Sequence, residues 1–217
     1  TIKCTPAGKC FAVLNVEFEP QPRANNGGCI GIDVGIKDFY SDSNGKVVPN
    51  PKYLEKSMRK LIREQRKLSR KEKGSSNRNK QRIKVALVHE KITNQRNDFL
   101  QKQSTMLIRE NQTICIEDLN IKGMQKRWGR KISDYGFSEF IKILEYKARE
   151  IGSIVQKIDR YYPSSQICHV CGTKNPETKN LAVREWICAK CKTSHDRDRN
   201  AAINIWKVGA STFFGEI

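Results

Sequence analysis

Residues 29–35 read CIGIDVG, and this segment is the strongest indication of the fold class of the chain. An apolar run of this length, bounded by glycines, is typical of a strand that is buried in a sheet. Two shorter strands are expected at residues 38–41 and 46–48, and they meet through Ser43-Asn44-Gly45, because Asn-Gly strongly favours a hairpin. The sheet therefore begins as an antiparallel trio.

The segments that follow alternate between helix and strand. Apolar residues at helical spacing predict helices over residues 54–103, and the break at Gly74-Ser75-Ser76-Asn77 favours a helical hairpin. Further strands are expected at 113–117 and 153–158, and further helices at 137–151 and 198–208. This order predicts an α/β fold with a mixed sheet and one meander edge, which is the layout of RNase H-like domains.

We divide the chain into four regions. Residues 1–26 contain a hairpin, with strands at 1–5 and 10–16, and a linker; a lone hairpin is marginal in water, so it is expected to belong to a larger sheet. Residues 27–162 form the α/β core with the helical insertion at 54–103. Residues 163–195 form a cysteine-rich module, and residues 196–217 form the final helix and tail.

The charge balance is strongly basic. Lys and Arg number 41 against 23 Asp and Glu, a net charge of +18, which favours binding to a polyanion such as nucleic acid. No apolar run approaches the roughly 18 residues that a membrane-spanning helix needs. We expect no membrane association and a cytoplasmic location in a prokaryotic cell.

The eight cysteines fall into two groups. Cys168 and Cys171 form one Cys-x2-Cys pair and Cys188 and Cys191 form another, a spacing that suits tetrahedral zinc. Four thiolates leave no open coordination position, so the zinc is expected to be structural. The other cysteines lie in strand-like apolar surroundings and are expected to be reduced thiols; they are Cys4, Cys10, Cys29 and Cys115.

Three carboxylates lie at the ends of predicted elements. Asp33 is in the first sheet strand between Gly31 and Gly35, which would let a phosphate backbone approach. Glu117 ends the fourth strand, and Asp198 opens the last helix. Magnesium prefers oxygen ligands, and two ions about 4 Å apart can promote phosphodiester hydrolysis.

Nearby acids leave the choice of ligands open. Glu117 and Asp118 are adjacent strand residues and cannot both face one site, and Asp196 is an alternative to Asp198 that also suits a helix N-cap. His195 is a candidate to assist this site, with a contact at the helix start as the alternative. Arg197 is a second candidate for assistance.

Two basic segments are candidates for nucleic-acid contacts. In the helical insertion, Lys and Arg recur at spacings of three and four residues, which lines a helix face with positive charge that binds phosphates without reading sequence. The candidates there are Arg59, Lys60, Arg63, Arg66, Lys67, Arg70, Lys71, Arg78, Lys80 and Arg82. The second segment holds Arg127, Trp128 and Arg130, in which the tryptophan could stack on a base.

As an ordered set, these motifs resemble the TnpB family, transposon-encoded RNA-guided nucleases related to type V CRISPR effectors. The motifs are Gly31-Ile32-Asp33-Val34-Gly35, Ile116-Glu117-Asp118-Leu119-Asn120, the two Cys-x2-Cys pairs and Asp198-Arg199-Asn200-Ala201-Ala202. The resemblance implies a RuvC-type nuclease domain with an inserted zinc ribbon. It also implies that Asp33, Glu117 and Asp198 are the catalytic acids and hold two magnesium ions, and that the four cysteines hold zinc.

The resemblance further implies partners. TnpB proteins bind a guide RNA derived from the transposon end. They cleave a DNA target that the guide RNA selects by base pairing. They also have an N-terminal lobe, of which residues 1–19 match only the last hairpin, so an association with such a lobe is expected.

The sequence therefore predicts a metal-dependent DNA endonuclease, RNA-guided in its full-length form. Two alternatives are a catalytically silent, guide-directed DNA-binding repressor, and a transposase that performs strand transfer on the same fold.

Overall fold

The computed structural model describes residues 1–24 and 27–214, except for the side chains of residues 127, 128, 130, 131, 213 and 214. Two compact units make up the chain: the first comprises Thr1–Glu19 and Lys52–Gln101, and the second comprises Pro20–Pro51 and Lys102–Ile217. Within the described residues, every helix is too short or too polar to cross a lipid bilayer.

The second unit is built on a five-stranded mixed sheet. Its strands are β3 (Cys29–Val34), β4 (Asp38–Asp42), β5 (Val47–Pro49), β6 (Thr113–Glu117) and β7 (Ile154–Ile158). The order in the sheet is β5-β4-β3-β6-β7; β3, β4 and β5 pair antiparallel, and β6 pairs parallel with both β3 and β7. The predicted mixed sheet with one meander edge is confirmed.

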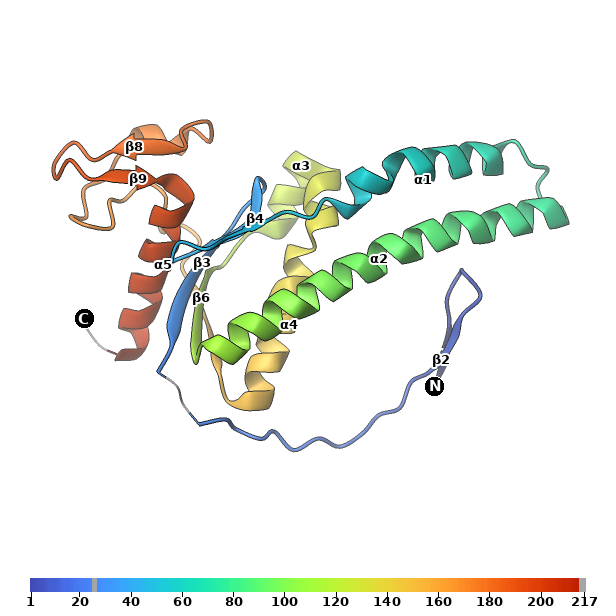
Figure 1. Cartoon of the computed structure of the whole chain (residues 1–217), viewed down its shortest axis with the longest axis horizontal. Coiled ribbons are helices and arrows are strands. Elements are labelled where there is room, and N and C mark those ends of the chain that lie inside the picture. Colours follow the sequence, from blue (N-terminus) through green and yellow to red (C-terminus); the bar gives the residue numbers. More distant parts are fainter. Residues whose placement is uncertain (25–26, 215–217) are drawn as a thin grey trace. The chain divides into compact units, whose positions relative to one another are not determined.

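Helices cover both faces of this sheet (Figure 1). On one face lies α5 (Arg197–Phe214), and on the other lies α4 (Phe137–Ile151), whose Phe140 ring is 5.0 Å from the Phe39 ring of β4. The first strand alternates accordingly, because Ile30 and Ile32 are buried on one face while Gly31 lies beneath α5.

The contact between α5 and β3 is too close for any side chain larger than hydrogen. A Cβ at Gly31 would lie 2.2 Å from the carbonyl oxygen of Ala202 and 2.5 Å from the amide nitrogen of Trp206. At Gly209 of the same helix, a Cβ would lie 2.3 Å from Cys115 Sγ. Gly31 therefore serves helix packing, and the expectation that it admits a phosphate backbone is wrong.

A helix that the sequence did not predict occupies the segment between β6 and the helix predicted at 137–151. This helix, α3 (Ile121–Tyr135), begins where the Asn120 side chain accepts a hydrogen bond from the Gly123 amide at 3.0 Å. It kinks at Gly129, whose φ is 32° and ψ is −101°. Two glycines weaken the helical signal of the sequence, whereas Ile132 and Tyr135 anchor the segment by burial.

The first unit contains the predicted helical hairpin. Its helices are α1 (Tyr53–Ser69) and the part of α2 (Ser76–Glu110) that extends to Gln101. Leu61 of α1 packs with Val88 and Ile92 of α2. The end predicted for the second helix, residue 103, is wrong because Leu107 and Ile108 are buried and extend the helix to Glu110.

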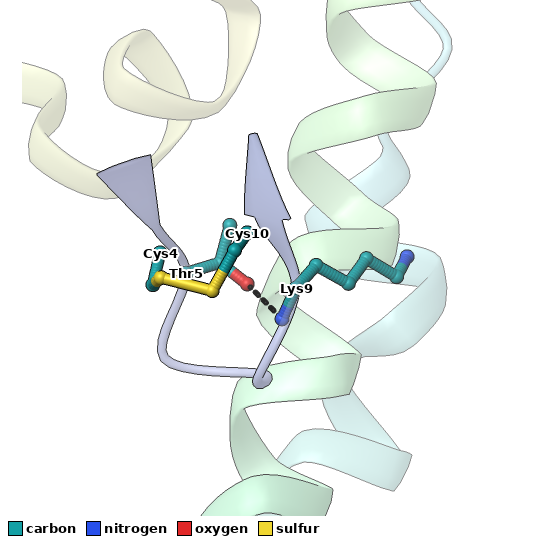
Figure 2. Close-up of a disulfide and its surroundings, with 4 residues drawn as sticks. All are labelled: Cys4, Thr5, Lys9 and Cys10. Atoms are coloured by element: carbon teal, nitrogen blue, oxygen red, sulfur yellow. Dashed lines mark hydrogen bonds between the residues drawn. A yellow bond between two sulfur atoms is a disulfide. The ribbon is translucent and has the colours of Figure 1, made fainter. Parts of the chain in front are cut away.

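The same unit contains the N-terminal hairpin of β1 (Ile2–Cys4) and β2 (Cys10–Ala12), which pair antiparallel. Cys4 and Cys10 lie opposite each other in this register and form a disulfide (Figure 2). The turn beneath it is held by Thr5, whose amide donates to the Lys9 carbonyl at 2.7 Å and whose Oγ1 accepts from the Lys9 amide at 3.3 Å.

The prediction of reduced, apolar thiols is wrong for Cys4 and Cys10, since both strands are exposed and register brings the two side chains together. Cys29 and Cys115 are free thiols, as predicted, with their Sγ atoms 3.9 Å apart.

We expect Gly31→Ala to lower the free energy of unfolding by about 1–3 kcal/mol, because the added methyl forces α5 away from β3. Gly35→Ala is the matched control, because its Cβ would meet only the Asp38 carbonyl oxygen at 3.2 Å. Urea titrations followed by circular dichroism would measure both. Equal midpoints for the two variants would contradict the packing argument.

Candidate active site

Two of the three predicted acids lie side by side at the ends of neighbouring strands. Ile32 of β3 is in register with Ile116 of β6, so Asp33 and Glu117, one residue further along these parallel strands, point to the same face. That face is the one that α5 covers.

The close packing of α5 on β3 places the third predicted acid, Asp198, near the other two. Ala202 lies against Gly31, and Asp198 is one helical turn before Ala202. Asp33 is two residues after Gly31, and two strand residues span about 6.6 Å while a helical turn spans about 5.4 Å. Asp198 is therefore brought to the end of the sheet where Asp33 lies.

The pKa of Asp33 reflects its proximity to the other two acids. Burial raises the pKa of Asp33 well above its usual range, and the negative charges of Glu117 and Asp198 raise this pKa further. Arg197 and Arg184 oppose the shift. Burial also raises the pKa of Glu117, against a hydrogen bond that Ser164 Oγ donates to Glu117 Oε1.

The competing acids have other partners. Asp118 accepts hydrogen bonds from the guanidinium of Arg160, with Nε at 3.0 Å from Oδ2. Asp196 Oδ1 accepts a hydrogen bond from the Arg199 amide at 2.8 Å, which is the N-cap contact predicted for it. Geometry thus groups Glu117 and Asp198 with Asp33 and gives the two neighbours structural contacts.

Two residues that contact these acids could not be identified from the sequence. Arg184, in the loop before β8 (Glu185–Ile187), places Nη1 3.3 and 3.2 Å from the two carboxylate oxygens of Asp198. Ser164, after β7, contacts Glu117. Neither belongs to a motif with recognisable spacing, because both reach the acids only through the folding of the cysteine-rich segment.

The four predicted cysteines form a compact group. Of the described His, Cys, Asp and Glu side chains, only these bring three or more ligand atoms within 4.8 Å of one another. Cys168 Sγ is 3.6 Å from Cys191 Sγ, and Cys171 Sγ is 3.5 Å from Cys188 Sγ. The group can hold a metal ion.

Each cysteine pair sits in the same kind of backbone knuckle. The Cys168 carbonyl accepts from the Gly172 amide at 2.9 Å, and the Cys188 carbonyl accepts from the Lys192 amide at 2.9 Å. Both donors have left-handed backbone, with φ of 73° at Gly172 and 60° at Lys192. The second knuckle therefore holds a conformation that glycine adopts more readily, which the backbone repeat imposes on Lys192.

Hydrogen bonds favour the thiolate form of two of these cysteines. The side chain of Thr173 lowers the pKa of Cys171 to about 6, and that of Thr193 lowers the pKa of Cys191. Burial has the opposite effect on Cys168, whose pKa rises to about 12. Thiolates are the metal-binding form of cysteine, so two ligands are prepared for a cation.

Of the two candidate assisting residues, His195 contacts the cysteine group, whereas Arg197 lies close enough to Asp33 to affect its pKa. His195 Nε2 is 3.1 Å from Cys168 Sγ, and the His195 ring packs on Trp186, so this side chain contacts the cysteine group. Arg197 is buried and donates from Nη1 to the Asn180 carbonyl at 3.5 Å.

Asparagines of α5 join the cysteine module to the acids. Asn200 Nδ2 donates to the Ile167 carbonyl at 2.8 Å, and Asn204 Nδ2 donates to the Ser164 carbonyl at 2.8 Å. Since Ser164 also contacts Glu117, the segment that leads into Cys168 is fixed to both the last helix and the acidic site.

The predicted basic residues of the insertion are not equivalent. Most are exposed along α1 and the start of α2, but Arg78 donates from Nη1 to the Leu68 carbonyl at 2.9 Å and the Lys71 carbonyl at 3.1 Å, which closes the end of α1. The side chains of Arg127, Trp128 and Arg130 lie outside the described residues.

Comparison with protein families matches residues 13–127 to OrfB_IS605, described as "Probable transposase", and residues 137–205 to "Cas12f1-like, TNB domain". A relative from Streptomyces pristinaespiralis, named "Putative RNA-guided DNA endonuclease", is 44% identical over 211 residues, which cover 96% of this chain and 52% of the relative. "TnpB-like protein L79" of Acanthamoeba polyphaga mimivirus is 29% identical over 206 residues, 85% of this chain and 38% of that protein.

The chain thus spans about half the length of the first of these relatives, and less of the second. Among solved structures, a Cas12f1-sgRNA-target DNA complex has a chain with a TM-score of 0.56 and 20% identity. The match covers 82% of this chain and 49% of that chain, and at this identity it concerns the fold.

The raised pKa of Asp33 predicts how stability depends on pH. Because the folded pKa exceeds the unfolded one, the folded chain binds more protons between the two values, so the free energy of unfolding falls as pH rises through this range. Without added metal, we expect Asp33→Asn to weaken this fall and to stabilise the chain at neutral pH by about 0.5–2 kcal/mol.

Denaturant midpoints measured across the acid and neutral range would check this. Asp118→Asn is the control, since Asp118 pairs with Arg160 at the surface and is not among the charges that act on Asp33, so this variant should keep the fall in stability that Asp33 causes. The argument fails if Asp33→Asn also keeps it.

Proposed function

The chain belongs to the OrfB_IS605 family, as the resemblance to TnpB predicted, and from this premise we propose that it carries a metal-dependent DNA endonuclease domain. The single observation that carries the proposal is the convergence of Asp33, Glu117 and Asp198 at one end of the sheet. The strand order β5-β4-β3-β6-β7 supports an RNase H-like, RuvC-type core.

The acidic site fits divalent cations. Its carboxylate oxygens are the donors that magnesium prefers, and the charges of Glu117 and Asp198 disfavour ionisation of Asp33, a repulsion that a cation would relieve. We assign the three acids as ligands of two magnesium ions. When bound, such ions supply an activated water and stabilise the leaving 3′ oxygen.

The chain's own residues prepare this chemistry. The rigid sheet holds Asp33 and Glu117 in register, and Ser164 orients Glu117 through its hydroxyl. Arg184 holds the Asp198 carboxylate and places a positive charge where an anionic phosphate would enter. Asp196 and Asn200 fix the first turn of α5, on which Asp198 stands.

Zinc is the metal that we propose for the cysteine group. Four thiol sulfurs in paired knuckles suit tetrahedral zinc and leave no site for a substrate, so the role is structural. Through Ser164 and Asn204, the loaded module would hold the acidic site in place.

We further propose that this domain acts in a longer, RNA-guided protein. The Streptomyces relative named as an RNA-guided endonuclease is about twice as long as the matched region, and the Cas12f1 structure is named as a complex with an sgRNA and a target DNA. Its partners would then be a transposon-derived guide RNA and a DNA target, together with an N-terminal lobe.

The family description favours one second candidate, a transposase that joins DNA strands with the same acids. The silent-repressor alternative is disfavoured because all three acids are present and converge.

Cleavage tests the proposal. We expect this chain to cut labelled single-stranded DNA with magnesium, and Asp33→Asn, Glu117→Gln and Asp198→Asn each to reduce the rate at least about a hundredfold. Asp118→Asn provides the matched control, since it changes a neighbouring acid that pairs with Arg160 and that the site does not use. Cutting that survives all three site variants contradicts the assignment, and a joined strand-transfer product would support the transposase.

Metal analysis tests the zinc proposal. Cys188→Ser removes one of four ligands, so we expect the purified variant to hold well under the one equivalent of zinc that wild type binds. Cys29→Ser, which removes a free thiol outside the group, should keep the wild-type content. Equal zinc in the two variants would exclude these cysteines as its ligands.

A further inference from the structure

The helical hairpin of the first unit has a solvent-open cavity of about 480 Å³ between α1 and α2. Five lysines line it: Lys56, Lys60 and Lys67 from α1, and Lys84 and Lys91 from α2. We call this cavity the lysine groove. Its floor includes Val88, which belongs to the hydrophobic contact between the two helices.

The groove has almost no negative charge of its own. The only carboxylate in its lining is Glu64, and this side chain is already satisfied, because Gln81 Nε2 donates to Glu64 Oε2 at 2.9 Å and Lys67 donates to Oε1 at 3.3 Å. Arg63 contacts the same oxygen at 3.2 Å. These hydrogen bonds, that of Gln81 foremost, lower the pKa of Glu64 to about 2.

The remaining lysines lack counter-charges. In the described part of the chain, no carboxylate pairs with Lys56, Lys60, Lys84 or Lys91. Like charges that face each other across a groove repel, and a solvated helix face usually intersperses acids among its lysines. The arrangement is therefore suited to an anion that lies between the helices.

The length of the lysine rows selects the kind of anion. Lys56 and Lys67 are eleven residues apart on α1, and Lys84 and Lys91 are seven apart on α2, so the rows extend about 16 Å and 10 Å. A small anion would meet only part of such rows. A nucleic-acid strand carries one charge per about 3.4 Å along its axis and can follow both.

We propose that the lysine groove binds the phosphodiester backbone of one nucleic-acid strand. This inference deepens the proposed function and rests on it. Lysine ammonium groups act as point charges without the planar fork of arginine, so the contact would be independent of base sequence. The structure thereby separates the groove lysines from the arginines of α1, such as Arg59 and Arg66, which do not line it.

The test compares two triple variants of equal charge. The groove variant is Lys60→Gln, Lys84→Gln and Lys91→Gln; Lys67 is kept because it contacts Glu64. The control is Lys3→Gln, Lys142→Gln and Lys179→Gln, three exposed lysines outside the groove. Circular dichroism and melting midpoints would establish that both fold like the wild type.

Fluorescence anisotropy would measure the affinity for labelled single-stranded RNA and single-stranded DNA of equal length between about 50 and 200 mM salt. Because the groove variant removes three ammonium groups that would each neutralise one phosphate, we expect its slope of log K against log salt to weaken by about 2. The control should keep a slope near that of the wild type.

The two nucleic acids identify the source of the strand: a larger loss of affinity with RNA indicates a guide strand, and a larger loss with DNA a target strand. Equal slopes for the groove and control variants overturn the proposal, as does wild type that binds neither nucleic acid. The proposal would also be overturned if poly-glutamate displaced the bound strand as effectively as unlabelled nucleic acid at the same concentration.

Should the triple variant fail to fold, the single variants Lys60→Gln and Lys91→Gln should each weaken the slope by about 0.7. The result is independent of the cleavage assay. A chain that binds through the groove without cutting contradicts the proposed nuclease activity alone, and a chain that cuts with unchanged salt slopes contradicts the groove alone.

Discussion

The close packing of α5 on β3 sets the geometry of the sheet, the acidic site and the cysteine module. A strand that carried any Cβ at position 31 would push the backbone of Ala202 and Trp206 outward, and Asp198 would move away with the first turn of the helix. Gly209, further along the same helix, must also lack a Cβ, because it packs closely against Cys115 of β6. The two glycines therefore set the distance at which a carboxylate from the end of the chain meets carboxylates from the middle of the sheet.

Without a bound cation, the closeness of these three carboxylates is electrostatically unfavourable. Three acids share one end of a sheet, and burial together with mutual repulsion keeps the pKa of Asp33 raised. The protein offsets part of this repulsion with cationic groups, of which Arg184 reaches Asp198 directly. An arrangement that lowers stability and yet is held by so many backbone and side-chain contacts is characteristic of sites selected for chemistry.

The cysteine module supplies much of that support. Its first knuckle is joined to α5 through Asn200 and Asn204, its entry segment contacts Glu117 through Ser164, and its second half provides Arg184. The four cysteines can hold a metal ion, and a small fold with few buried apolar residues gains most of its stability from such an ion, so metal binding would link the ordering of this module to that of the acidic site. The basic helices, by contrast, form their own core around Leu61, Val88 and Ile92 and present charge that the acidic site does not use.

Features that depend on local residue patterns could be predicted from the amino-acid sequence. Apolar alternation and turn residues predicted the five strands of the sheet, their meander edge and most helices, and the spacing of the cysteines predicted the four-sulfur group. The residue pattern could not distinguish Glu117 from Asp118, because the strand face that α5 covers is known only from the fold. It also could not distinguish Asp198 from Asp196, because the residue that caps the helix depends on tertiary contacts. Four features became visible only in the folded chain: the Cys4–Cys10 disulfide, the role of Gly31, the contact of Arg184 with Asp198 and the lysine groove. Each of these joins residues that are brought together by register or helix packing, and such contacts leave no periodic signal in a single sequence.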